Sequence, residues 1–122
     1  MSARNIDPTA ELSAVLILAL GQNQGSIKDL VKLYLQNEGI EYRFIEQISK
    51  AAVTPDNVPD ILTQIRKLEL NKFKNITTLH LFYNGPVSLA VLLGSQLQAF
   101  NLIVYQYDKK SSKVYYRMGS NH

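Results

Sequence analysis

The sequence contains no cysteine, and this absence excludes several kinds of site. Disulfide bonds, thiolate zinc sites, iron–sulfur clusters and cysteine nucleophiles all need the thiol group that the chain lacks. The absence is also consistent with a reducing compartment. A stable fold must therefore come from a hydrophobic core, and 122 residues with 46% hydrophobic side chains are enough for one such core.

Long hydrophobic runs are absent as well. The longest run, residues 14–20, has seven residues, whereas a helix that crosses a bilayer needs roughly 20. Residues 1–11 carry one basic and two acidic side chains, so they lack the basic start and apolar centre of a secretory signal. We therefore expect a cytoplasmic protein that has no membrane as a partner.

Charge is divided unevenly along the chain, although the net charge is only +3. Residues 1–60 hold five basic and eight acidic side chains, whereas residues 61–122 hold eight basic and two acidic ones. A basic half fits a polyanionic ligand, because phosphates attract clustered Lys and Arg. A solvated helix face followed by a basic tail explains the same asymmetry, and charge alone does not decide between the two interpretations.

Apolar residues follow two patterns along the chain. Continuous or alternating apolar runs predict five strands, at residues 12–20, 40–48, 76–83, 102–107 and 113–118. Apolar residues at helical spacing predict three helices between them, which end near residues 37, 75 and 100. The first begins near residue 26, the second is capped by Asp56 or Asp60, and the third begins near residue 86.

The predicted order βαβαβαββ is typical of an α/β, Rossmann-like domain of three layers, with a mostly parallel sheet and helices on both faces. Residues 108–112 have about the length of a hairpin loop, so the last strand is expected to form a C-terminal antiparallel hairpin at a sheet edge. No internal repeat or low-complexity linker interrupts the pattern. We therefore predict a short leader at residues 1–11 and a single domain over residues 12–122.

Two loops have the position of a binding site, because ligands of such sheets bind beyond the carboxyl ends of the strands. The first follows the first strand and offers uncharged polar groups from Gly21, Gln22, Asn23, Gln24 and Ser26. It matches neither the dinucleotide motif G-x-G-x-x-G nor the Gly-Lys-Ser/Thr of a P-loop, so no nicotinamide cofactor or ordinary nucleoside triphosphate is expected. Its glycines can also serve only to turn the chain sharply.

The second loop follows the third strand and contains Tyr83, Asn84, Gly85, Pro86 and Ser88. Gly85 allows a close backbone approach, Tyr83 can stack on a base, and Asn84 can hydrogen-bond a base edge or a phosphate. A helix that opens with proline is also common in proteins that bind nothing, so this loop alone is a weak signal.

Lys50 follows the second strand and can neutralise a phosphate on the same rim, or it can be an ordinary solvated lysine. His80 lies inside the third strand, where a hydrogen-bonded structural histidine is favoured over a metal ligand. Tyr105 is expected to pack under a helix.

Residues 80–94, HLFYNGPVSLAVLLG, and 103–108, IVYQYD, together resemble the C-terminal motif of SAVED domains. That motif has a His-Leu-Phe strand, a Gly-Pro helix start and a closing Tyr-x-Tyr-Asp strand. SAVED domains are sensors of cyclic oligonucleotide second messengers in bacterial anti-phage systems, both CBASS and type III CRISPR, and they resemble two fused CARF-like (CRISPR-associated Rossmann) halves. Outside residues 80–108 the resemblance is one of architecture.

The resemblance implies a cyclic oligonucleotide ligand, with cyclic oligoadenylate favoured, and it suggests ligand-facing roles for the residues of the second loop. The first loop and Lys50 are added by sheet geometry and not by the motif. The chain has room for one CARF-like half and no effector, so the resemblance also implies a homodimer, a higher homo-oligomer or a second CARF-like subunit as partner. No cofactor, metal ion or duplex DNA is expected.

Three functions remain open at this point. The favoured one is a binding module, either a sensor subunit or a protein that sequesters the messenger. The alternative is a ring nuclease, which would cleave the ring without a metal ion by positioning a ribose hydroxyl in line with the phosphate. The predicted rim has no histidine and at most one lysine, which suits recognition better than proton transfer. A structural or protein-interaction role is the third, because fold does not imply function.

Overall fold

The computed structural model of the chain describes residues 12–20, 27–108 and 113–120. The strands are β1 (Ser13–Leu20), β2 (Phe44–Lys50), β3 (Thr78–Asn84), β4 (Asn101–Asp108) and β5 (Lys113–Ser120). The helices are α2 (Ile27–Asn37), α3 (Val58–Leu70) and α4 (Val87–Gln96). No helix in these ranges is long and apolar enough to span a membrane. The predicted alternation of strands and helices is confirmed.

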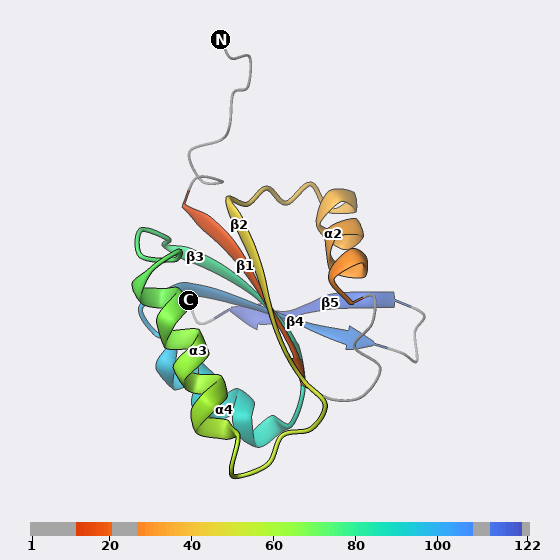
Figure 1. Cartoon of the computed structure of the whole chain (residues 1–122). Helices are drawn as coiled ribbons and strands as arrows, with labels where there is room; N and C mark the ends of the chain where they lie inside the picture. The colour runs from red at the N-terminus through yellow and green to blue at the C-terminus, as the bar shows by residue number, and fades with distance from the viewer. Residues whose placement is uncertain (1–11, 21–26, 109–112, 121–122) are drawn as a thin grey trace.

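The strands form one sheet in the order β2-β1-β3-β4-β5 (Figure 1). Neighbouring strands among β2, β1, β3 and β4 run parallel, and β5 runs antiparallel to β4. Parallel neighbours need crossover connections, and these contain α2, α3 and α4. This is the Rossmann-like α/β arrangement that the sequence predicts. Of the predicted hairpin loop, residues 108–112, Asp108 is the last residue of β4 and residues 109–112 lie outside the described residues.

Helices cover both faces of the sheet, α3 and α4 on one face and α2 on the other (Figure 1). Ile61 of α3 and Leu93 of α4 belong to the same core cluster as Leu16 of β1. Val31 of α2 packs on the other face with Ile17 of β1. Because β1 has a strand on each side and helices on both faces, all eight of its residues are buried. This explains why its sequence is a continuous apolar run and not an alternating one.

Helix α2 ends in a turn that requires glycine. Gly39 has a φ of 68°, in the left-handed region that side chains disfavour. The N–H of Ile40 donates to the carbonyl of Leu35 at 2.9 Å, and the N–H of Gly39 donates to that of Gln36 at 3.2 Å. These are the two bonds of a Schellman motif. The strand that follows begins at Phe44 and not at residue 40 as predicted.

Helix α4 is shorter than predicted. It ends at Gln96, and residues 97–100 form a turn in which the N–H of Phe100 donates to the carbonyl of Leu97 at 3.1 Å. Leu97 and Phe100 are nevertheless buried in the core. Their helical spacing therefore reflects burial on the sheet and not a longer helix.

Candidate functional site

The strand order reverses between β1 and β3, because the chain leaves β1 for β2 on one side and later adds β3 on the other. In open α/β sheets, ligands bind at the carboxyl ends of the strands at such a reversal. The register places Asn84 of β3 beside Ala19 of β1, and Lys50 of β2 beside Leu20 of β1. The carboxyl ends of β1 and β3 therefore lie side by side.

Of the two loops, only the second lies within the described residues. Tyr83, Asn84, Gly85, Pro86 and Ser88 are all described, although nothing is described of the Val87 side chain. Gly21, Gln22, Asn23, Gln24 and Ser26 fall on residues 21–26, outside the described residues. Their contribution to the site stays a prediction.

Tyr83 ties the second loop to the core. Its side chain is only 7% exposed and belongs to the core cluster between the sheet and helices α3 and α4. The hydroxyl donates a hydrogen bond to the backbone carbonyl of Pro86. Burial raises the pKa of Tyr83 to about 12, so the hydroxyl keeps its proton and remains a donor at neutral pH. The structure thus gives Tyr83 a positioning role, and its stacking on a base stays a prediction.

Gly85 is needed because the loop passes close to the end of β1. A Cβ atom at this position would lie 2.9 Å from Oη of Tyr83 and 3.1 Å from Cβ of Leu20. A carbon atom does not fit at the first distance without displacing the tyrosine hydroxyl from its bond to Pro86. The predicted close approach at Gly85 is therefore made by the protein's own side chains.

Helix α4 begins directly at this loop. Pro86 is its N-cap residue, with extended backbone (φ −67°, ψ 145°), and its carbonyl accepts the N–H of Ala90 at 3.3 Å. The first N–H groups of a helix find no acceptor inside the helix, and no side chain in the described part of the chain caps those of α4. An anion above this edge can bond to them and is favoured by the helix dipole. Ser88 is exposed beside them.

Asn84 lies on the other face of β3 from Tyr83, because successive side chains of a strand alternate. It is half-buried at the last position of the strand. Its amide therefore lies at the rim of the site on the side that α2 covers, where it can donate to and accept from a ligand.

Lys50 is the last residue of β2, two strands away from Asn84, or about 10 Å at the usual strand spacing. Its Nζ atom lies 2.8 Å from Oδ2 of Asp60, in the first turn of α3. Hydrogen bonds from Lys50 and then from Gln64 hold the pKa of Asp60 below its usual value. A phosphate at this position must therefore compete with Asp60 for the lysine.

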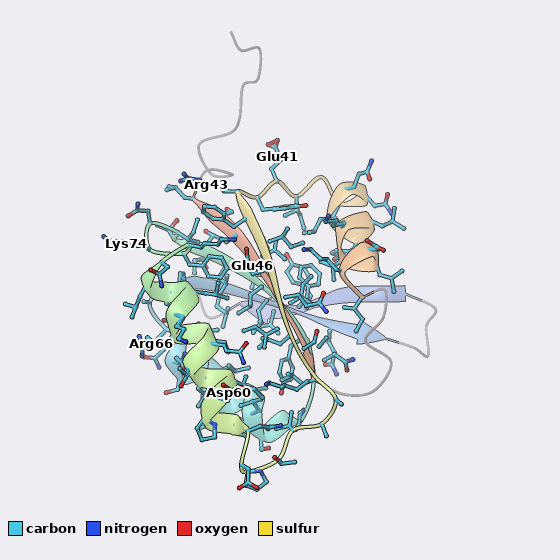
Figure 2. All side chains as sticks on the ribbon, viewed as in Figure 1. Glu41, Arg43, Glu46, Asp60, Arg66 and Lys74 are labelled. Carbon is cyan, nitrogen blue, oxygen red and sulfur yellow. The ribbon has the colours of Figure 1, made fainter. Side chains whose placement is uncertain are left out.

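Asp60 lies near the site, and its pairing with Lys50 is a contact that sequence reasoning missed. The signal was present, because the first turn of a helix that follows a parallel strand lies at the carboxyl edge, where that strand also ends. Figure 2 shows Asp60 near the start of α3, while Arg43 and Lys74 lie toward the opposite end of the sheet. Arg43 and Lys74 are therefore not part of this edge, and for Lys74, which belongs to the basic half of the chain, the solvated-surface interpretation of the charge asymmetry fits.

His80 is buried next to Tyr105, and its Nδ1 atom lies 2.8 Å from the tyrosine hydroxyl. The Tyr105 ring stacks on Phe82 at 4.3 Å and meets Tyr34 of α2 edge to face at 5.7 Å. The predicted structural roles of His80 and Tyr105 are confirmed. Within the described ranges, no group of three or more His, Asp or Glu side chains could hold a metal ion.

A hollow of about 340 Å³ lies between β2 and α3 and is lined by Glu46, Gln47, Ile48, Gln64, Lys67, Leu68, Asn71 and Lys72. Lys72 and Glu46 form an ion pair within it at 2.5 Å. Because β2 is an edge strand and none of the lining residues belongs to β1 or β3, this hollow is separate from the carboxyl ends of β1 and β3.

The comparison with known families agrees with the motif at residues 80–108. The SAVED family, described as "SMODS-associated and fused to various effectors sensor domain", matches residues 14–118. No curated protein matches the chain. The matched segment runs from the second residue of β1 into β5, so it includes α2, α3, α4 and the whole second loop. The chain therefore belongs to the SAVED family of sensor domains.

Proposed function

We propose that this SAVED domain binds a cyclic oligonucleotide second messenger, with cyclic oligoadenylate the favoured ligand, at the carboxyl edge of β1 and β3. SAVED domains are sensors of cyclic oligonucleotides in anti-phage systems. The observation that carries the proposal is the position of the loop after β3. Tyr83 bonds to this loop at Pro86, the N-cap residue of α4, and Gly85 packs against Leu20 at the end of β1.

The groups on this edge suit the chemistry of such a ring. A cyclic oligonucleotide presents phosphates and unpaired bases together. The N–H groups at the start of α4 suit a phosphate, and the Asn84 amide suits a base edge. The loop is already held in place by the Tyr83–Pro86 hydrogen bond, so less ordering entropy is lost when the ligand binds.

The binding unit is larger than one copy of the chain. One copy offers one carboxyl edge, whereas a ring of nucleotides has polar groups around its whole circumference. We therefore include in the proposal a second protomer, either another copy of this chain or a second CARF-like subunit, that holds the other side of the ring. The protein then acts as a sensor subunit or as a protein that sequesters the messenger.

The test is to incubate the purified protein with cyclic di-, tri-, tetra- and hexanucleotides, remove unbound ligand, denature the protein and identify the nucleotides by chromatography with mass detection. We expect an intact ring to be retained. Linear products would instead establish the ring nuclease alternative. If every ring emerged unbound and uncut, the proposed function would be wrong.

Substitution of Asn84 by Ala tests the position of the site. Loss of one or two hydrogen bonds to the ligand should weaken binding about tenfold. Asn75→Ala is the matched control, because Asn75 is exposed in the turn that precedes β3, at the opposite end of that strand. Calorimetry that finds equal affinities for the two variants would place the ligand elsewhere.

A further inference from the structure

Asn84 is followed by Gly85, and of the nine asparagines in the sequence it is the one that precedes a glycine. In spontaneous deamidation, the backbone nitrogen of the following residue attacks the asparagine side chain. Glycine has no Cβ atom to shield this nitrogen, and it leaves the backbone the greatest freedom of rotation. The sequence therefore singles out Asn84 for this reaction, and Asn84 also lies at the rim of the proposed binding site.

The reaction needs only the groups at this position and water. The Gly85 nitrogen forms a bond to Cγ of Asn84, and the side-chain nitrogen leaves with the proton of the Gly85 N–H as ammonia. Water then opens the resulting five-membered imide at either of its two carbonyl groups. One opening gives aspartate, and the other gives isoaspartate, whose backbone runs through the former side chain. Asn84 and Gly85 are both partly exposed, so water can reach them.

The folded loop holds the two reacting groups apart. Asn84 is the last residue of β3 and pairs with Ala19 of β1, and the extended backbone of a strand turns the following nitrogen away from the side chain. Ring closure therefore needs a rotation between Asn84 and Gly85. Gly85 has little room for it, because a Cβ atom built there would lie within 3.1 Å of both Tyr83 and Leu20.

One hydrogen bond closes the second loop around Gly85. It runs from the Tyr83 hydroxyl to the carbonyl of Pro86. Pro86 and Ser88 are themselves exposed, whereas Leu89 of α4 is buried in the core. Exposed segments with few buried contacts open locally while the core stays folded. Release of the Tyr83–Pro86 bond is therefore enough to free the backbone at Gly85 without unfolding β3 or α4.

We propose that Asn84 deamidates when this loop opens, and that the resulting carboxylate weakens ligand binding at the same edge. The second part rests on the proposed function, since it concerns the phosphates of the ligand. An amide donates and accepts hydrogen bonds, whereas an ionised carboxylate only accepts them and carries a negative charge. A phosphate bound at the start of α4 is repelled by this charge, in addition to the loss of the hydrogen bond from the amide.

Peptide mapping by mass spectrometry tests the first part without any nucleotide. The folded protein is kept at mildly alkaline pH, where the attacking nitrogen loses its proton more readily, and the replacement of NH2 by OH is followed at Asn84 and Asn75. Asn75 is more exposed than Asn84, but it precedes Ile76 and not a glycine. We expect Asn84 to react several times faster. An equal or slower reaction at Asn84 would overturn the proposal.

Two tyrosine variants test whether the loop opens locally. Tyr83→Phe removes the bond to Pro86, and Tyr105→Phe removes the buried bond between Tyr105 and His80 on the other face of the sheet. Loss of the first bond should raise the reaction rate at Asn84 about fivefold, because the loop opens more often. Tyr105→Phe is the matched control and should leave the rate unchanged. Equal acceleration by both variants would mean that only global unfolding exposes Asn84, and the proposed role of the loop would be wrong.

Asn84→Asp tests the second part, because this variant is the aspartate product made directly. Its affinity for a ring that the wild-type protein retains should fall further than the about tenfold expected for Asn84→Ala. Added salt should reduce the difference between the two variants, since it screens the charge. Asn75→Asp places the same charge at the opposite end of β3 and should bind like the wild type. Equal affinities of Asn84→Asp and Asn84→Ala would disprove the effect of the charge.

The mapping experiment needs no ligand, so the two proposals can fail separately. A protein that deamidates fastest at Asn84 but retains no ring would disprove the proposed function and leave the modification site standing. A ring retained by a protein in which Asn84 reacts no faster than Asn75 would disprove the modification site and leave the function standing.

Discussion

Helices α2 and α4 follow neighbouring strands of one sheet and begin at the same edge, yet they meet the solvent differently (Figure 1). In α2 the buried residues Ile27, Val31 and Leu35 form one stripe, and charged side chains such as Lys28 and Lys32 are exposed. In α4 no side chain is charged, and apolar side chains lie on both sides of the helix. An amphipathic helix such as α2 is complete once one face is covered. Helix α4 exposes two large apolar side chains, Val91 and Leu92, whereas α2 exposes one, Leu33, so the two helices differ in how much apolar surface the fold leaves uncovered.

The largest effect on stability is expected from replacing a buried leucine in either helix. Leu35 of α2 and Leu93 of α4 are both fully buried. Replacing either by Ala should lower the free energy of unfolding by about 2–5 kcal/mol, because each leaves a cavity in the core. Urea unfolding at a few micromolar protein measures both variants. A cost below about 1 kcal/mol at Leu93 would mean that α4 is loosely packed, and the comparison with α2 would fail.

Gly85 lies just before α4, and Gly94 lies near its C-terminal end. Replacing each by Ala should change the stability of the fold in opposite directions. Gly85→Ala forces a Cβ atom against Tyr83 and Leu20 and should destabilise the fold by about 1–3 kcal/mol. Gly94→Ala places its Cβ atom in open space within a helix and should stabilise the fold by up to about 1 kcal/mol. Thermal and urea unfolding would report both. Equal shifts of the same sign would contradict the packing described for the loop.

Two buried tyrosines allow a comparison of the two faces of the sheet. Tyr83→Phe removes the hydrogen bond to Pro86 and should cost about 1 kcal/mol in stability. Tyr105→Phe removes the bond to His80 and should cost a similar amount. Only Tyr83→Phe should also weaken ligand binding, because only Tyr83 holds the second loop. Equal losses of affinity in calorimetry would mean that the loop does not need this bond.

The smallest expected effect is a difference between wild-type protein and Tyr83→Phe in how stability depends on pH. The pKa of Tyr83, about 12 in the folded state, lies above the value of about 10 for an unfolded tyrosine. The contribution of the neutral hydroxyl is therefore complete below about pH 10 and is lost as pH rises through about 12. Wild-type protein should lose more stability than Tyr83→Phe over this interval. Parallel pH profiles of the urea midpoints would contradict a buried phenol.

Much of the architecture could be predicted because it depends on local pattern. The continuous apolar run of β1 signals a strand that is covered on both faces, and it is one. The helical spacing of Leu97 and Phe100 was misleading, because a turn at the end of α4 buries the same residues. The start of β2 was also misplaced, since residues 40–43 have a composition typical of strands but connect α2 to the sheet.

The candidate site was predictable only in its location. The rule that ligands bind at the carboxyl ends of the strands brings the loop after β3 to the junction with β1. The rule does not show that Tyr83 points into the core or that Gly85 packs against Leu20, because these contacts join residues far apart along the chain. The pairing of Lys50 with Asp60 was missed although both residues could be placed at the carboxyl ends of the strands from the sequence.

The sequence by itself determined the order of strands and helices, the family to which the chain belongs and the edge of the sheet where a ligand is expected. These depend on hydrophobic periodicity and on short motifs, which are properties of neighbouring residues. Only the tertiary structure decided which apolar residues of α4 face the sheet and which face the solvent. In a helix without charged side chains the pattern does not distinguish the two sides, so Val91 and Leu92 become visible as exposed only when the other side is packed on the sheet.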